Sequence, residues 1–128
     1  MKKVDDGRRV QRVEREVQEI VSRFLMGTFK GDLPGIVTVT QVRMPPDLKA
    51  AKVYVSVLNT TVQADHEAAA EVLQERAYEM QKYLAANLSL RFTPKLQFLP
   101  DLSLEKVLKI DRILHDLSQG KRPAEDED

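Results

Sequence analysis

At 128 residues the chain is long enough for one domain with its own hydrophobic core, and its 42% hydrophobic and 31% charged residues are typical of a soluble globular protein. The absence of cysteine excludes disulfides and thiolate metal sites and fits a cytoplasmic location. No apolar run approaches twenty residues and the N-terminus lacks an apolar signal core, so we expect neither a membrane span nor secretion.

The charges are unevenly distributed along the chain. The 20 Lys and Arg residues balance the 20 Asp and Glu residues, which taken whole argues against a nucleic-acid partner. However, 125–128 is an acidic run, and without its four residues the body has 20 basic against 16 acidic side chains, a net charge of +4 that permits an RNA partner. We therefore predict a flexible N-terminus at 1–7, a folded domain at 8–117 and a disordered acidic tail at 118–128 that is dispensable for folding.

The segment Arg8–Leu25 predicts an amphipathic helix. Its apolar residues recur three and four positions apart: Val10, Val13, Val17, Ile20, Val21 and Phe24. Away from this stripe, arginines also repeat at helical spacing: Arg8, Arg12, Arg15 and Arg23. Two interpretations remain open, a solvated face with salt bridges to Glu16 and Glu19, or a row of guanidinium groups that faces RNA phosphates.

Two β-strands are predicted within Ile36–Leu58. The second has clean alternation, because Val53, Val55 and Val57 share one face. In the first strand the valines change face between 39 and 42, which predicts a bulge or slip near Gln41. Two prolines at 45 and 46 end that strand, so we interpret the stretch as a β-hairpin.

The stretch Asp65–Arg91 contains neither glycine nor proline and predicts a long helix with Asp65 as its N-cap. Its apolar stripe is Ala69, Leu73, Ala77, Met80, Leu84 and Leu88. A straight helix of this length would span about 40 Å, which is long for a domain whose radius of gyration is about 14 Å. We therefore expect a kink inside it, at a place that no breaker residue marks.

A short third strand around Leu96 and Phe98 and a last helix at Ser103–Leu117, with Ser103 as its cap, complete the chain. The apolar face of the last helix is Leu104, Val107, Ile110, Leu114 and Leu117. The order helix, strand, strand, long helix, strand, helix predicts an α+β domain in which a three-stranded sheet packs against helices.

Few residues suit catalysis. His66 and His115 each stand alone, and we interpret both as surface histidines whose joint replacement by alanine leaves function unchanged. Gly27–Gly31 lacks the spacing of a phosphate-binding loop, and solvation explains the acidic pair Glu14 and Glu16 better than acid–base chemistry. We predict no enzyme activity, no cofactor, no metal and no small-molecule substrate.

Basic side chains are the remaining candidates for function. They flank the first helix, the long helix and the entry to the third strand, and together they would supply about four to six salt-sensitive phosphate contacts. The candidate RNA-binding residues are Arg8, Arg9, Arg12, Arg15, Arg76, Lys82, Arg91 and Lys95.

Three stretches in register resemble the ribosome-binding factor A family. They are RRVQRVEREVQEIVSRFL, VTVTQVRMPPDLKAAKVYVSVL and LRFTPKLQFLPDLSLEKVLKIDRIL, and the resemblance covers residues 8–117. The residues that carry the family's patterns are Asp47–Leu48, Ala51–Ser56 and Leu90–Asp101.

This resemblance implies a type II KH-like fold with the order α-β-β-α-kink-α-β-α. It also implies a monomeric, cytoplasmic ribosome assembly factor that binds the free small (30S) ribosomal subunit and its 16S rRNA. The family's work is late 16S rRNA maturation, including 5′-end processing, and growth in the cold, and its members are not themselves nucleases.

The chain departs from the family at the kink. The family often has Ala-x-Gly there, whereas the corresponding residues here are Arg76, Ala77 and Tyr78, so a kink requires a non-glycine residue outside helical geometry. The paired glycines of the ordinary KH loop are also absent, which argues against single-strand clamping in that mode.

The alternative function is a protein–protein adaptor that uses an exposed sheet edge or helix without direct RNA binding. Strongly salt-sensitive binding would favour RNA, whereas salt-insensitive binding to a protein would favour the adaptor.

Overall fold

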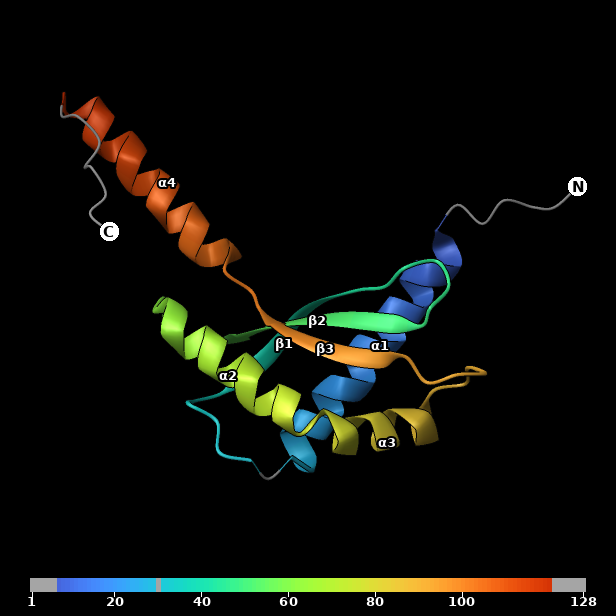
Figure 1. Cartoon of the computed structure of the whole chain (residues 1–128). Helices are drawn as coiled ribbons and strands as arrows, with labels where there is room; N and C mark the ends of the chain where they lie inside the picture. Colours follow the sequence, from blue (N-terminus) through green and yellow to red (C-terminus); the bar gives the residue numbers. More distant parts are fainter. Residues whose placement is uncertain (1–6, 30, 121–128) are drawn as a thin grey trace, which may run out of the picture.

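The computed structural model describes residues 7–29 and 31–120, and for 104–107 the backbone alone. Figure 1 shows the elements in chain order: α1 (Arg8–Gly27), β1 (Val37–Arg43), β2 (Ala50–Val57), α2 (Gln63–Glu75), α3 (Ala77–Asn87), β3 (Lys95–Pro100) and α4 (Ser103–Ser118). This order confirms the predicted α+β fold class. Most of the predicted flexible N-terminus and the acidic run of the predicted tail lie outside the described residues.

The strands form one mixed sheet in the order β1-β2-β3. β1 and β2 are antiparallel, as in the predicted hairpin, and the register shifts between Val39 and Gln41, which confirms the predicted bulge. β2 and β3 are parallel, so the chain must cross from one end of the sheet to the other between them, and α2 and α3 make this crossover.

The helices α1, α2 and α3 cover one face of the sheet (Figure 1), and the core lies between these two layers. The predicted apolar stripes point into it. All six stripe residues of the predicted long helix are buried, as are Phe24 and Phe98. The apolar periodicity therefore identified the core faces of α1, α2 and α3 correctly.

The predicted kink is a break between α2 and α3 at Arg76. This residue has φ −108° and ψ 17°, and its N–H donates to the Leu73 carbonyl at 3.0 Å. Since its φ is negative, any L-residue can occupy the position, and the break needs no glycine.

The predicted bounds of this helical region were wrong. α2 begins at Gln63 after Val62, and α3 ends at Asn87. Asp65 is not the N-cap but lies in the first turn, where its carboxylate accepts a hydrogen bond from the Thr60 hydroxyl at 2.8 Å.

The last helix departs from the predicted layering, because α4 projects away from the sheet and from the other helices (Figure 1). Its described apolar side chains are exposed: Leu108, Ile110, Ile113, Leu114 and Leu117. The prediction of Ser103 as its cap was also wrong, since Ser103 is the first residue of α4 and Leu102 precedes it.

Side chains from the helices occupy hydrogen-bonding groups at both edges of the sheet. On β3, Gln74 accepts from the Phe98 N–H at 2.7 Å and donates to the Leu96 carbonyl at 3.3 Å, and Gln81 accepts from the Leu96 N–H at 2.9 Å. On β1, Gln18 of α1 donates to a strand carbonyl at 3.1 Å. These edges are therefore poor templates for pairing with another strand.

Among the helices that the structure describes, none has both the length and the apolar character needed to cross a membrane.

Candidate nucleic-acid interface

Basic side chains gather at the end of the sheet where β1 passes into β2. Arg43 at the end of β1 lies opposite Lys52 of β2 in the strand register. Lys95 opens β3, and its N–H donates to the Lys49 carbonyl at 3.0 Å. The parallel β2–β3 pairing therefore brings lysines from distant parts of the sequence together.

A turn anchored in the core presents Lys49. The Leu48 N–H donates to the Pro45 carbonyl at 2.9 Å, and the Lys49 N–H donates to the Asp47 carboxylate at 3.0 Å. Leu48 has φ 58°, a left-handed conformation that costs a non-glycine residue about 1–2 kcal/mol. Its side chain is buried, which contributes about 1.5–3 kcal/mol and offsets that cost. Core packing thus fixes this turn.

The start of α1 lies at the same end of the molecule. Glu14 accepts from the Met44 N–H at 2.7 Å and lies 4.0 Å from the Arg43 guanidinium. Because Gln18 meets β1 further back along the strand, α1 runs antiparallel to β1, and residues before 14 extend past the hairpin. The interpretation of Glu14 as a solvated carboxylate was therefore wrong, since its side chain is only 12% exposed and ties α1 to β1.

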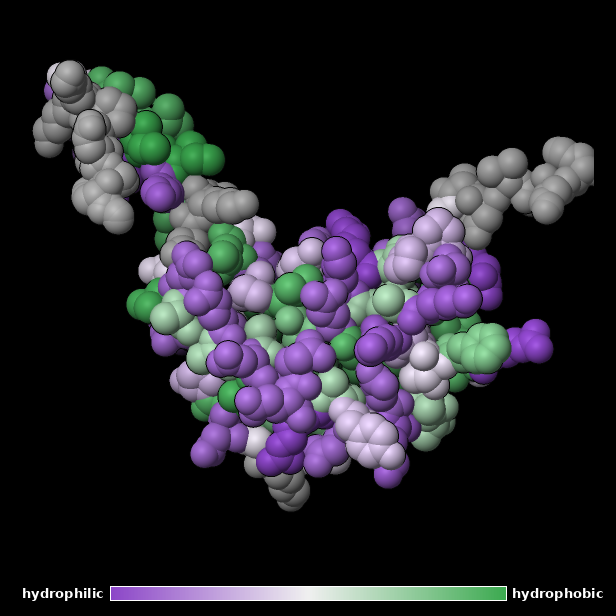
Figure 2. Space-filling model, in the orientation of Figure 1, coloured by the Kyte–Doolittle hydropathy of each residue, from purple (hydrophilic) through white to green (hydrophobic). Residues whose placement is uncertain are grey.

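We call this surface the basic end. Figure 2 shows hydrophilic side chains on the right of the view, as on much of this face. In the part of the chain that the structure describes, Asp47 and Glu14 lie among these cations, and both make the contacts just described. The basic end consists of Arg8, Arg9, Arg12, Arg43, Lys49, Lys52, Arg91 and Lys95.

The structure places five of the eight predicted RNA-binding residues at the basic end: Arg8, Arg9, Arg12, Arg91 and Lys95. Arg15 lies beside Arg12 on the outer face of α1, where both border a shallow groove of about 590 Å³. No ion pair joins Arg12 or Arg15 to Glu16 or Glu19 in the part of the chain that the structure describes, so the predicted salt bridges do not form there.

The other two predicted residues, Arg76 and Lys82, lie away from the basic end. The Arg76 guanidinium stacks over the Phe29 ring at 5.7 Å and lies 3.3 Å from Glu79, so it holds the helix break in place. The Lys82 ammonium lies 5.2 Å from the centre of the Tyr78 ring within α3.

Sequence reasoning missed Arg43, Lys49 and Lys52. The signal was present, because all three flank the predicted turn of the hairpin, and a hairpin places the residues beside its turn at one end of the sheet. Their proximity to Lys95 had no such signal, since it depends on the pairing of β2 with β3.

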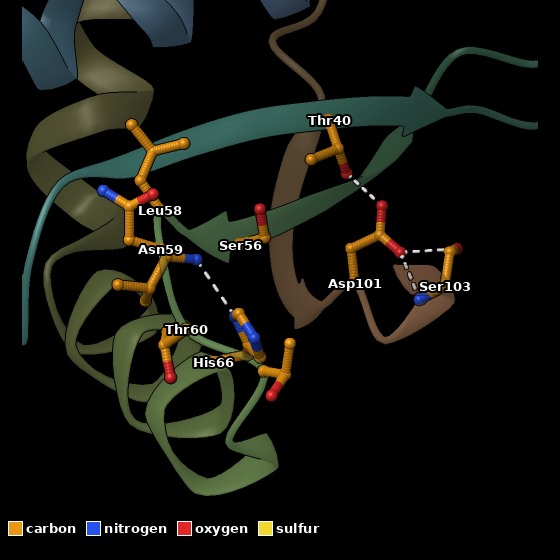
Figure 3. A pocket seen from close by; sticks show the side chains of 10 residues that line it. Thr40, Ser56, Leu58, Asn59, Thr60, His66, Asp101 and Ser103 are labelled. Carbon is orange, nitrogen blue, oxygen red and sulfur yellow. Dashed lines mark hydrogen bonds between the residues drawn. The ribbon is translucent and has the colours of Figure 1, made fainter. Parts of the chain in front are cut away.

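A hollow of about 530 Å³ at the opposite end of the sheet is the second candidate site (Figure 3). Five of its ten lining residues carry a hydroxyl group, and one histidine and one carboxylate join them. Its lining residues are Thr40, Ser56, Val57, Leu58, Asn59, Thr60, Thr61, His66, Asp101 and Ser103.

The histidine in this hollow is structural. His66 is only 5% exposed, and its Nδ1 accepts a hydrogen bond from the Val57 N–H at 3.0 Å (Figure 3). The prediction of a surface histidine without a partner was therefore wrong. His115, on α4, is exposed as predicted.

Asp101 is also held by hydrogen bonds. It accepts hydrogen bonds from the Thr40 hydroxyl, from the Ser103 N–H at 2.9 Å and from the Ser103 hydroxyl at 2.6 Å. Burial, the largest influence, raises the pKa of the Asp101 carboxyl, but the Ser103 and Thr40 hydrogen bonds, with the nearby His66, together outweigh it and lower the pKa.

The hollow shows no serine–histidine pair among its described hydrogen bonds. The Ser103 hydroxyl donates to Asp101, and the Nδ1 of His66 accepts from the Val57 N–H. The described residues also include no group of three or more His, Cys, Asp or Glu side chains that could hold a metal ion.

The α-β-β-α-α-β core, with its mixed sheet and its broken helix pair, defines the class: a type II KH-like domain. The model of the family described as ribosome-binding factor A matches residues 9–114. The chain belongs to the ribosome-binding factor A family.

Named relatives agree with this assignment. Ribosome-binding factor A of Bdellovibrio bacteriovorus is 49% identical over 131 aligned positions, which cover 100% of this chain and 96% of the relative. The crystal structure of ribosome-binding factor A from Thermus thermophilus shares the fold at a TM-score of 0.59 and 23% identity, covering 70% of this chain and 92% of the other. Thermus thermophilus coordinates fitted into a cryo-electron-microscopy map of a complex with the 30S subunit give a TM-score of 0.55 at 24% identity, covering 69% and 90%.

Proposed function

We propose that this chain is a ribosome assembly factor that binds the free 30S subunit and assists late maturation of 16S rRNA. The observation that carries the proposal is the family match over 9–114. The 30S complex of the Thermus thermophilus relative supports the choice of particle. From the resemblance we extend the proposal to 5′-end processing of 16S rRNA, to growth in the cold, and to action as a cytoplasmic monomer without a cofactor.

The basic end is the surface that we propose for rRNA. Its cations belong to paired strands, to a turn that is anchored in the core and to the start of α1. The folded backbone therefore fixes their spacing before RNA binds. Structured RNA is recognised mainly by shape and by contacts to phosphates and 2′-hydroxyls. A fixed array of cations at the basic end supplies such contacts even though the whole chain carries no net charge.

Co-sedimentation with free small subunits, free large subunits and whole ribosomes at two salt concentrations tests this proposal. We expect selective binding to free small subunits that weakens as salt rises. The double variant Lys49→Ala/Lys52→Ala should lower the slope of log K against log salt concentration by about 1.4–1.8, because each lost phosphate contact removes about 0.7–0.9. The matched control Lys109→Ala/Arg112→Ala removes two cations from α4 and should leave the slope unchanged.

Failure of the wild-type chain to bind any particle would overturn the proposal. The processing role has its own test in the source bacterium: deletion of the gene should slow growth in the cold and increase the fraction of 16S rRNA with an unprocessed 5′ end. Normal 5′ ends in the deletion strain would restrict the proposal to subunit binding.

The adaptor remains a second candidate because of the exposed apolar side chains on α4. Its sheet-edge form loses support, since glutamine side chains occupy both edges. Binding to a protein that resists high salt and is lost on Ile110→Glu/Leu114→Glu would favour the adaptor over the RNA-binding factor.

A further inference from the structure

The loop between α3 and β3 projects from the body near the basic end (Figure 1), and it contains an exposed phenylalanine. Phe92 is 64% exposed, although phenylalanine is usually found inside proteins. Leu88 and Pro94 are buried on either side, and Leu90 packs against the core. The loop is therefore anchored at both ends, and its tip presents one aromatic ring to solvent.

One cation lies against this ring, and a second follows it along the chain. The Arg91 guanidinium lies over it, 5.6 Å from the ring centre. Lys95 follows three residues later, at the start of β3, and is bonded through its backbone to Lys49. The other exposed large apolar side chains of the body that flank the hairpin, Ile36 and Leu58, lie where β1 begins and β2 ends, at the opposite end of the sheet.

This combination fits a nucleic acid better than a protein. A protein hot spot is an aromatic ring inside a packed apolar patch, whereas the ring of the exposed Phe92 has the Arg91 guanidinium against it. Single-stranded RNA has groups that complement this site, namely a flat base that can stack on the ring and phosphates that can pair with the neighbouring cations.

We propose that Phe92 is a stacking site for an unpaired nucleobase of RNA, with Arg91 and Lys95 on the adjacent phosphates. The proposal rests on the proposed function for its RNA partner and adds the contact: a single-stranded segment at the tip of this loop.

The chain contains no tryptophan, so Phe92→Trp supplies a single fluorophore at the proposed site. The matched control is Met26→Trp, because Met26 is 87% exposed but lies at the far end of α1. The probes are a single-stranded oligouridylate and a double-stranded RNA of equal length, with binding followed independently by anisotropy of labelled RNA. We expect single-stranded RNA to quench Phe92→Trp, double-stranded RNA to quench it much less, and neither to quench Met26→Trp.

Affinity gives the second readout. Phe92→Ala should weaken binding to single-stranded RNA about 5- to 160-fold, the range of one lost base–aromatic stack. The salt slope should not change, because Phe92 carries no charge, whereas Arg91→Ala should lower the slope by about 0.7–0.9. Phe92→Trp retains the aromatic face and should bind as the wild type does.

The outcomes separate this inference from the proposed function. Binding of Phe92→Trp to single-stranded RNA without quenching, equal quenching by double-stranded RNA, or wild-type affinity in Phe92→Ala would each overturn the stacking site and leave subunit binding intact. Unchanged RNA affinity with lost binding to a subunit protein would also overturn it and assign Phe92 to a protein contact. Absence of wild-type binding to any ribosomal particle would instead overturn the proposed function.

Discussion

Replacing His66 tests how much the structure depends on one buried hydrogen bond. In His66→Ala the Val57 N–H loses its acceptor inside the core, and an unsatisfied buried donor costs about 1–3 kcal/mol. Loss of the imidazole's packing adds about 1 kcal/mol. We therefore expect the free energy of unfolding to fall by about 2–4 kcal/mol, a large share of the 5–15 kcal/mol that is typical of a domain.

Two further substitutions isolate the cause. His66→Asn places an amide oxygen where Nδ1 lies and should recover about 1 kcal/mol or more of the loss, because the Val57 N–H again has an acceptor. His115→Ala is the matched control, since His115 is exposed on α4 and its replacement should stay within about 0.5 kcal/mol of the wild type. Urea unfolding at pH 7, followed by far-ultraviolet circular dichroism, measures all three variants.

Two results would refute this reasoning. A His66→Ala variant as stable as the wild type would mean that the hydrogen bond contributes nothing. Equal losses in the alanine and asparagine variants would mean that packing, and not the acceptor, is what matters.

Three more substitutions address other parts of the fold. Asp101→Asn should lower the free energy of unfolding by about 1–2 kcal/mol at pH 7. Because the folded-state pKa of Asp101 lies below the ordinary value of 3.8, the carboxylate's contribution to stability is complete above that value and is lost as the pH falls through the folded-state pKa. A difference from wild type that stayed constant in urea titrations from pH 6 to pH 2 would contradict this assignment. Arg76→Gly should destabilise by about 1 kcal/mol through loss of the stack on Phe29, and calorimetry that showed a more stable glycine variant would mean that the break is strained. Gln74→Ala should open the β3 edge, cost about 1 kcal/mol and increase self-association in sedimentation-velocity runs, whereas the exposed control Gln97→Ala should sediment as the wild type does.

Periodicity alone predicted the core faces of α1, α2 and α3. The change of face between Val39 and Val42 located the bulge, since an extra residue is what shifts alternating side chains to the other face. The burial of His66 was also readable, because His66, Ala69, Ala70 and Leu73 share one helical stripe. It was missed because histidine was classed by its polarity and not by its position.

Other features left no local signal. The break at Arg76 uses backbone angles that any residue adopts, so only the family resemblance located it. The amphipathic pattern of 103–117 predicted a helix but not its surroundings, since periodicity shows that a face is apolar and not what covers it.

The residues of the candidate site likewise divide into those that local spacing predicts and those that only the tertiary structure brings together. Local spacing on α1 identified the row that contains Arg12, but the neighbours of Lys95 depend on a strand pairing between residues more than forty positions apart. Likewise Arg76 was chosen for its place at a bend, and only its contacts with Phe29 and Glu79 show that its charge is already engaged.

The parallel pairing of β2 with β3 also sets an order of events during folding. The β1–β2 hairpin joins neighbouring segments, and such hairpins close in about 1–10 μs. β3 joins only after α2 and α3 have crossed the sheet, a slower step because a long loop must close first. Lys49 and Lys95 become neighbours at that step. A partly folded chain therefore carries every charge of the basic end without its arrangement, and tight RNA binding would distinguish chains that have completed folding from those that have not.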